Sequence, residues 1–148
     1  MQDRDEVLKA VKRYQQLYLK LAGPVRDVWS ISQTEFDVIA FLSNHPGCNT
    51  AKDVCEMRML KKSNVSVAID NLTRRGLVAC SVDRQDRRVN RLQFLPEAEP
   101  LRKEIRRVQN EFGRILFDGI PRDEIESYLD VLRKTSEHAE SAMKEKEE

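Results

Sequence analysis

The chain has 148 residues and a mass of 17.2 kDa, with 34% charged and 6% aromatic residues and only five glycines and five prolines. This length fits one domain, and the composition favours a helix-rich protein over a β-sandwich or a β-barrel. No run approaches the roughly 20 apolar residues of a membrane helix, the charged N-terminus lacks an apolar signal core, and the three cysteines are widely spaced, so we expect a cytoplasmic protein with no membrane partner and no disulfide framework.

Apolar residues recur at steps of four and three over residues 5–22, which predicts an amphipathic helix. Gly23-Pro24 follows this stripe, and we expect it to end the helix. The stripe consists of Val7, Val11, Tyr14, Tyr18 and Leu21.

Two capping boxes predict the starts of the next two helices. Ser32 and Glu35 can exchange hydrogen bonds between side chain and backbone at the first start, and His45-Pro46-Gly47 closes that helix. Thr50 and Asp53 repeat the arrangement, with aspartate in place of glutamate, and open a short helix.

A further helix is predicted over residues 63–75, and Gly76 falls where a left-handed residue ends many helices. Two short helices joined by a tight turn, the second of them polar on its outer face, form a helix-turn-helix pattern. The inward residues of the second helix are Val65, Ala68, Ile69 and Leu72.

Residues 77–82 and 89–94 alternate as strands do and flank a charged loop, which predicts a β-hairpin with an arginine-rich tip. Two long amphipathic helices follow, one after Pro96 and one with Pro121 in its first turn. The predicted fold class is therefore mainly α with a small β-hairpin: a winged helix-turn-helix region at 32–95, flanked by helical dimerisation regions at 1–31 and 96–148. We expect a homodimer, because an unpartnered apolar stripe costs about 25 cal/mol per Å² of exposed surface.

Positive charge is concentrated in the centre of the chain. Residues 61–91 contain eight basic and three acidic residues, a net charge of +5, although the whole chain carries only +1. Such a segment is either a solvated basic surface or the footprint of a polyanion partner.

At this point the sequence resembles the MarR family of bacterial transcription regulators. Residues 32–36 (SQTEF) look like the opening of that family's second helix, 62–66 (KSNVS) like the start of its recognition helix, and 72–78 (LTRRGLV) like the end of that helix and the first wing strand. Residues 83–88 (DRQDRR), followed by 92–95 (LQFL), look like its wing. The resemblance covers about residues 5–142 and implies a winged helix that binds double-stranded DNA.

In that docking mode the second helix enters the major groove, where Asn can pair with adenine and Val can touch a thymine methyl group. The resemblance also implies that Arg87 or Arg88 pairs with an aspartate at the base of the wing while another arginine enters the minor groove, a place that suits Arg84 at the tip. Because no arginine of the helix is aimed at guanine, A·T-rich half-sites are favoured. The expected DNA contacts are Lys62, Ser63, Asn64, Ser66, Val67, Asn71, Arg74, Arg84, Arg87 and Arg88.

Two means of regulation are suggested. The family often binds aromatic acids or other lipophilic compounds between its dimerisation helices and its DNA-binding lobe, and Tyr14, Tyr18, Trp29 and Phe112 are candidates to line such a cleft, or alternatively to form core. Cys48, in a loop before a helix, is the candidate for a redox-active thiol, with an inert cysteine as the alternative.

The sequence contains no constellation typical of an enzyme, and we expect neither catalysis nor a cofactor. His45, Cys48 and Cys55 supply too few ligands for a structural zinc, so no metal is expected. The predicted function is a homodimeric transcription regulator, in particular a repressor, that binds a pseudo-palindromic operator and is released by a small effector or by thiol oxidation. The alternative is a winged helix that docks onto proteins and does not read DNA.

Overall fold

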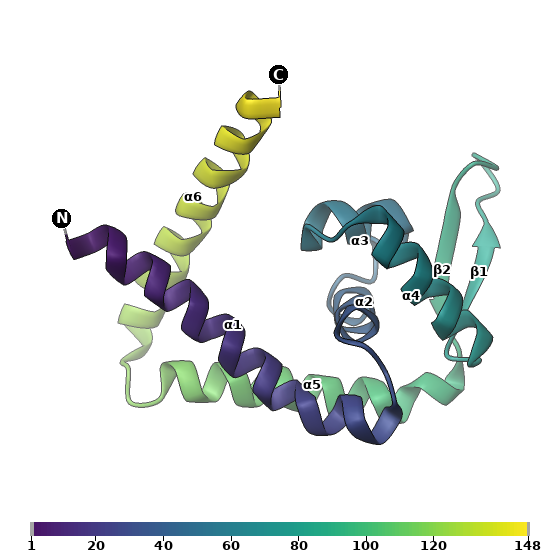
Figure 1. Cartoon of the computed structure of the whole chain (residues 1–148), viewed down its shortest axis with the longest axis horizontal. Coiled ribbons are helices and arrows are strands. Elements are labelled where there is room, and N and C mark those ends of the chain that lie inside the picture. Colours follow the sequence, from purple (N-terminus) through teal and green to yellow (C-terminus); the bar gives the residue numbers. More distant parts are fainter. Residues whose placement is uncertain (1, 148) are drawn as a thin grey trace. The chain divides into compact units, whose positions relative to one another are not determined.

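The computed structural model describes residues 2–147, and these fall into two compact units, residues 2–112 and 113–147. None of the helices in this part of the chain combines the length and the apolar composition of a membrane-spanning segment. The elements in chain order (Figure 1) are α1 (Gln2–Trp29), α2 (Gln33–Asn44), α3 (Ala51–Arg58), α4 (Lys62–Arg74), β1 (Val78–Val82), β2 (Asn90–Phe94), a 3₁₀ turn (Pro96–Ala98), α5 (Glu99–Phe117) and α6 (Arg122–Glu147). The predicted fold class, mainly helical with one two-stranded hairpin, is confirmed.

Helix α2 lies at the centre of the first unit, where Figure 1 views it almost end-on. Its predicted capping box is present, because the Glu35 backbone N–H donates to Ser32 Oγ at 3.1 Å and the Glu35 carboxylate accepts from the Ser32 backbone. Its side chains are buried on more than one face, as expected of a helix surrounded by other elements. The buried apolar residues are Phe36, Val38, Ile39, Ala40, Phe41 and Leu42.

Helix α1 is longer than predicted. The prediction that Gly23-Pro24 ends it is wrong, because the helix continues to Trp29 with the proline inside it. A proline within a helix removes one backbone hydrogen bond, but Ala22 is fully buried and Trp29 packs against the core, so burial on both sides holds this segment helical. The Arg26 guanidinium also donates to the Leu19 carbonyl at 3.0 Å, one turn before the proline.

The helix-turn-helix is built by α3 and α4. The Thr50–Asp53 capping box is present at the start of α3, and Met59, the residue after that helix, caps it in the left-handed conformation, with φ 55°. The four predicted inward residues of α4 are buried. Gly76 has φ 73°, a value at which a side chain would be strained, so a glycine suits the end of α4.

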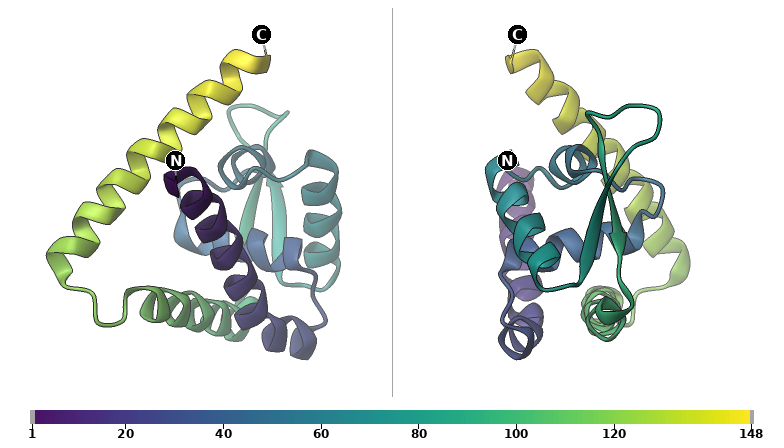
Figure 2. Two further views of the ribbon diagram at one scale, coloured as in Figure 1. Left: turned by 60° about the vertical axis from the view of Figure 1, so that its left-hand side comes forward. Right: turned by 90° about the vertical axis from the view of Figure 1, so that its right-hand side faces the viewer.

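The hairpin of β1 and β2 is antiparallel, and Val78 pairs with Phe94 near its base. The loop of residues 83–89 lies at its far end (Figure 2). The base is fixed to the helices, because the Leu92 N–H donates to the Asn49 carbonyl at 2.7 Å and the Leu77 carbonyl accepts from Leu95. The hairpin therefore projects from a secured base.

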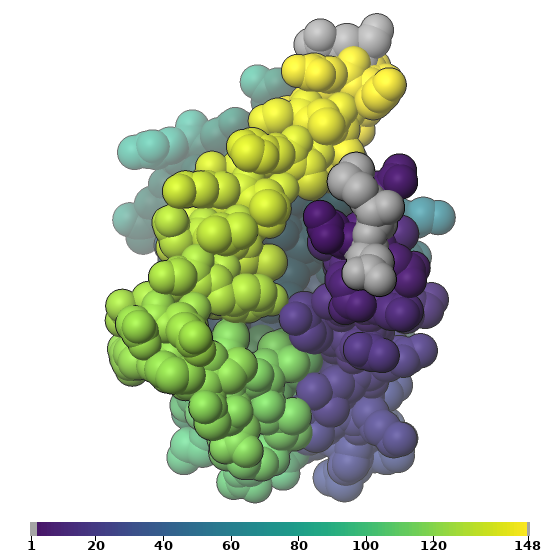
Figure 3. Space-filling view, turned by 90° about the vertical axis from the view of Figure 1, so that its left-hand side faces the viewer, coloured from purple at the N-terminus to yellow at the C-terminus, as the bar shows by residue number. Residues whose placement is uncertain are grey.

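The two C-terminal helices differ in how much of their surface is buried. In α5, Leu101, Ile105 and Val108 are buried in the same core as α2, so the first part of this helix belongs to the winged-helix unit. Helix α6 has no buried residue, and Figure 3 shows its surface along its length. It begins at Arg122, with Pro121 preceding the first turn and not within it. Its exposed apolar residues include Tyr128, Leu129, Val131, Leu132 and Met143.

Candidate nucleic-acid interface

Helix α4 has one face in the core and one in solvent. The buried face fixes the rotation of the helix about its axis, and this rotation leaves the polar face outward. Val67 is exposed despite being apolar, with 60% of its surface accessible. All the predicted contacts on this helix are at the surface, with Asn71 half-buried and the others exposed: Lys62, Ser63, Asn64, Ser66, Val67 and Arg74.

The N-terminus of α4 is electropositive and open. Lys61 occupies its cap position without a side-chain hydrogen bond to the helix, and both Lys61 and Lys62 are exposed. Uncapped backbone N–H groups and the helix dipole favour negative charge at such an end.

The wing loop presents Arg84, Arg87 and Arg88, all exposed. Arg88 Nε lies 3.7 Å from Asp86 Oδ1, and the Arg88 backbone N–H donates to the same oxygen at 3.1 Å. The expected arginine–aspartate pair is therefore formed by Arg88, but within the loop and not at the wing base. Arg84 and Arg87 extend into solvent from the same loop.

Another arginine fixes the base of the wing. Arg91 Nε lies 3.7 Å from Asp83 Oδ1, and its Nη1 donates to Asn49 Oδ1 at 2.8 Å. This pair joins the wing to the loop before α3. The sequence analysis missed Arg91, because its partner Asn49 is 42 residues away and no local pattern connects the two.

The exposed face of α4 and the arginine loop both belong to one matched segment: residues 29–89 match the model of the MarR family. This match makes the chain similar to the MarR family over its winged-helix region. A comparison with curated proteins finds no match.

Solved structures share the MarR fold with this chain. A MarR transcriptional regulator from Methanosarcina mazei Go1 is 20% identical, with a TM-score of 0.76 over 91% of this chain and 99% of the other. The PcaV regulator from Streptomyces coelicolor, in complex with its natural ligand, is 21% identical with a TM-score of 0.67, covering 88% and 91%. The transcriptional repressor CouR, bound to a 23-mer DNA duplex, is 20% identical with a TM-score of 0.68, covering 88% and 89%.

Three of the four candidate effector residues line one cavity. Tyr14, Tyr18 and Phe112 surround a space of about 450 Å³ between α1 and α5. The Tyr18 and Phe112 rings meet edge to face at 5.3 Å, and Gln109 donates to the Tyr18 hydroxyl at 3.3 Å. Burial raises the pKa of Tyr18 above its usual 10.0, so the hydroxyl is neutral at physiological pH. The residues that the sequence analysis missed here are Gln15, Asn44, Arg58 and Gln109.

Trp29 is not part of this cavity. Because α1 continues through Pro24, Trp29 lies 11 residues beyond Tyr18 on one helix, about 16 Å along the axis. Its indole instead donates to Glu104 Oε2 at 2.6 Å. The grouping of Trp29 with the other three residues is therefore wrong.

The cysteines differ in exposure. Cys48 is half-buried and packs against the core, as does Cys55, whereas Cys80 on β1 is exposed. Reaction with an oxidant requires access to the sulfur. By its exposure, Cys80 is therefore a better candidate than Cys48 for a redox-active thiol. Among residues 2–147, no group of three or more His, Cys, Asp or Glu side chains is placed to hold a metal ion.

Proposed function

We propose that this protein is a homodimeric repressor that binds a pseudo-palindromic operator and is released by a small aromatic or lipophilic effector. The observation that carries the proposal is the exposed polar face of α4 beside an arginine loop that projects on a fixed base. The complex of CouR with a DNA duplex supports this mode for the shared fold.

The two parts of the interface would make different contacts. The α4 residues Asn64, Ser66 and Val67 suit the edges of bases in the major groove, with Asn pairing to adenine and Val to a thymine methyl group. Arg84 and Arg87 suit a narrow A·T minor groove, which attracts guanidinium groups. Together they favour A·T-rich half-sites.

Dimerisation would cover apolar surface that the chain leaves open. The N-terminal half of α1 exposes Val7, Leu8 and Val11, with 62% of Val7 accessible, and α6 exposes an apolar series of its own. A two-fold axis through such helices presents two copies of α4 about one DNA turn (roughly 34 Å) apart. Light scattering should give twice the 17.2 kDa of the chain, and a monomeric mass at micromolar concentration contradicts the dimer.

The cavity of about 450 Å³ is the proposed effector site. Its size fits a small aromatic compound, and Arg58, which lines it, is the last residue of α3 in the helix-turn-helix. An effector releases DNA only if it binds one arrangement of the two DNA-binding units better than the other. PcaV, solved with its natural ligand, supports control by a ligand. Release by thiol oxidation is the second route, and Cys48→Ser and Cys80→Ser test it under peroxide.

Selection from a randomised pool of DNA duplexes at low ionic strength tests the proposal. We expect enrichment of inverted A·T-rich half-sites and a steep loss of affinity with salt, because the basic residues displace counterions. Benzoate is then titrated into the selected complex as the first effector probe, and dissociation by benzoate but not by acetate is expected. A pool without enrichment, or binding that is insensitive to salt, contradicts DNA reading and favours a protein-docking module.

A further inference from the structure

The end of the recognition helix α4 is tied to the end of α1. Arg75, which caps α4, donates from Nη2 to the Trp29 carbonyl at 2.5 Å and from Nη1 to the Ser30 carbonyl at 3.2 Å. Ser30 has φ 52°, a left-handed conformation that non-glycine residues seldom adopt. One guanidinium thus holds two successive carbonyls at the strained exit from α1.

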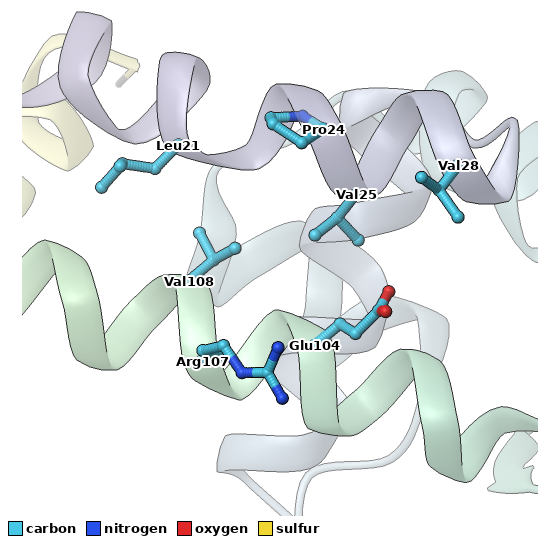
Figure 4. Close-up of a pocket in the computed structure, with 7 residues that line it drawn as sticks. All are labelled: Leu21, Pro24, Val25, Val28, Glu104, Arg107 and Val108. Atoms are coloured by element: carbon cyan, nitrogen blue, oxygen red, sulfur yellow. The ribbon is translucent and has the colours of Figure 1, made fainter.

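The connection continues to α5. The indole of Trp29 donates to Glu104 Oε2 at 2.6 Å, so a single residue joins Arg75 on one side to Glu104 on the other. Glu104 also lines a cavity of about 270 Å³, where its carboxylate points toward α1 (Figure 4). We call Arg75, Trp29 and Glu104 the Arg75 clamp. Trp29 is the last residue of α1, Glu104 lies on α5 and Arg75 caps α4, and all three belong to the first unit.

The neighbouring residue Arg74 provides a contrast. Both arginines are exposed and adjacent in sequence, but only for Arg75 are partners on another element described, and these are backbone carbonyls. Its guanidinium is thereby occupied and directed at α1. A guanidinium that holds two carbonyls of another element restrains the helix end to which it belongs, and small errors in the placement of recognition residues weaken binding.

We propose that Arg75 is a positioning residue for DNA reading, which sets the orientation of α4 by clamping its end to α1 and, through Trp29, to α5. The proposal rests on the proposed function, in which α4 reads the major groove. Arg75 acts through backbone carbonyls and contributes no phosphate contact. The same clamp also carries any displacement of α1 or α5 to the end of α4.

The first experiment measures the affinity of the full-length protein for its selected duplex and for an unrelated duplex, over a range of salt concentrations. We expect Arg75→Ala to weaken specific binding about tenfold, equivalent to about 1.4 kcal/mol, with the affinity for unrelated DNA and the salt slope unchanged. Arg75→Lys keeps the charge but lacks the planar fork that holds two carbonyls, so we expect it to restore little. Arg74→Ala is the matched control and should reduce the slope.

Each opposite result overturns the clamp. Full activity in Arg75→Lys shows that charge alone is needed, a shallower slope in Arg75→Ala shows a phosphate contact, and unchanged specific affinity shows no role. Trp29→Phe removes the indole N–H to Glu104 and part of the ring volume, and it keeps the backbone carbonyl that Arg75 holds. Its effect and that of Arg75→Ala should be less than additive in the double variant, and strict additivity contradicts a connected unit.

A second readout needs no DNA, so that failure of the clamp and failure of the proposed function are distinguishable. Trp29 is the sole tryptophan of the chain, and its fluorescence reports on the clamp directly. The amides of Gly76 and Leu77 donate to Thr73 and Leu72 at the end of α4. We expect Arg75→Ala to shift the emission and to speed hydrogen exchange of these two amides, whereas Arg74→Ala changes neither. Unchanged emission and exchange in Arg75→Ala overturn the clamp even if no operator is found.

Discussion

Replacing Arg74 with alanine tests whether the outer side of α4 lies against the DNA backbone. The side chain is exposed in the last turn of the helix and adds to the basic segment of residues 61–91. A basic side chain that neutralises one phosphate contributes about 0.9 to the slope of log affinity against log salt. A homodimer carries the residue twice, so the Arg74→Ala slope should be shallower by about 1.8.

This change in slope corresponds to a large difference in salt sensitivity. Between about 0.05 M and about 0.2 M salt, a fourfold increase, the wild-type protein should lose about twelvefold more affinity than the variant. Fluorescence anisotropy of a labelled duplex at a series of salt concentrations measures both slopes. Arg106→Ala is the control, because Arg106 is exposed on α5 and lies outside the proposed interface. Equal slopes for wild type and Arg74→Ala, or an equal loss in the control, refute the reasoning.

Three further predictions concern the fold and the wing. Pro24→Ala should stabilise the protein by about 1–3 kcal/mol in urea unfolding, because proline inside a helix is unfavourable by up to that amount relative to alanine; destabilisation contradicts a continuous α1. Burial raises the pKa of the Asp37 carboxyl above its usual 3.8, although Gln33 and two arginines oppose the shift. Because the folded protein resists ionising this carboxyl, Asp37 destabilises the fold as the pH rises above that value. Asp37→Asn should therefore raise the melting temperature at pH 7, with the gain disappearing toward and below the usual pKa, and a gain independent of pH excludes this cause. Arg91→Ala removes the contacts to Asp83 and Asn49. Faster hydrogen exchange is then expected in the loop of residues 83–89, and unchanged exchange means that the Arg91–Asp83 ion pair does not hold the wing.

Local signals in the sequence predicted most of the elements. The capping boxes at Ser32 and Thr50 each bring donor and acceptor within three residues, and both are present as expected. Gly76 adopts the left-handed conformation that its position at the end of α4 predicts. These features depend on backbone geometry and immediate neighbours, which a single sequence contains.

Features that depend on distant contacts were missed or wrong. Pro24 is a local stop signal, but the burial of Ala22 and the packing of Trp29 on the core outweigh it, and only the folded chain shows that burial. Because α1 continues through Pro24, Trp29 lies outside the cavity that Tyr14 and Tyr18 line, contrary to the prediction. Arg91 and its partner Asn49 are likewise joined by tertiary structure alone.

The central claim is that two copies of α4 and its wing read one duplex about a two-fold axis. The most direct test compares the dissociation constant for the selected operator with that for the same operator carrying an insertion of about five base pairs, half a helical turn, between the half-sites. The insertion turns the half-sites to opposite faces of the DNA, and the account predicts that affinity falls to the level of unrelated duplex. Equal affinity for the two duplexes would contradict it.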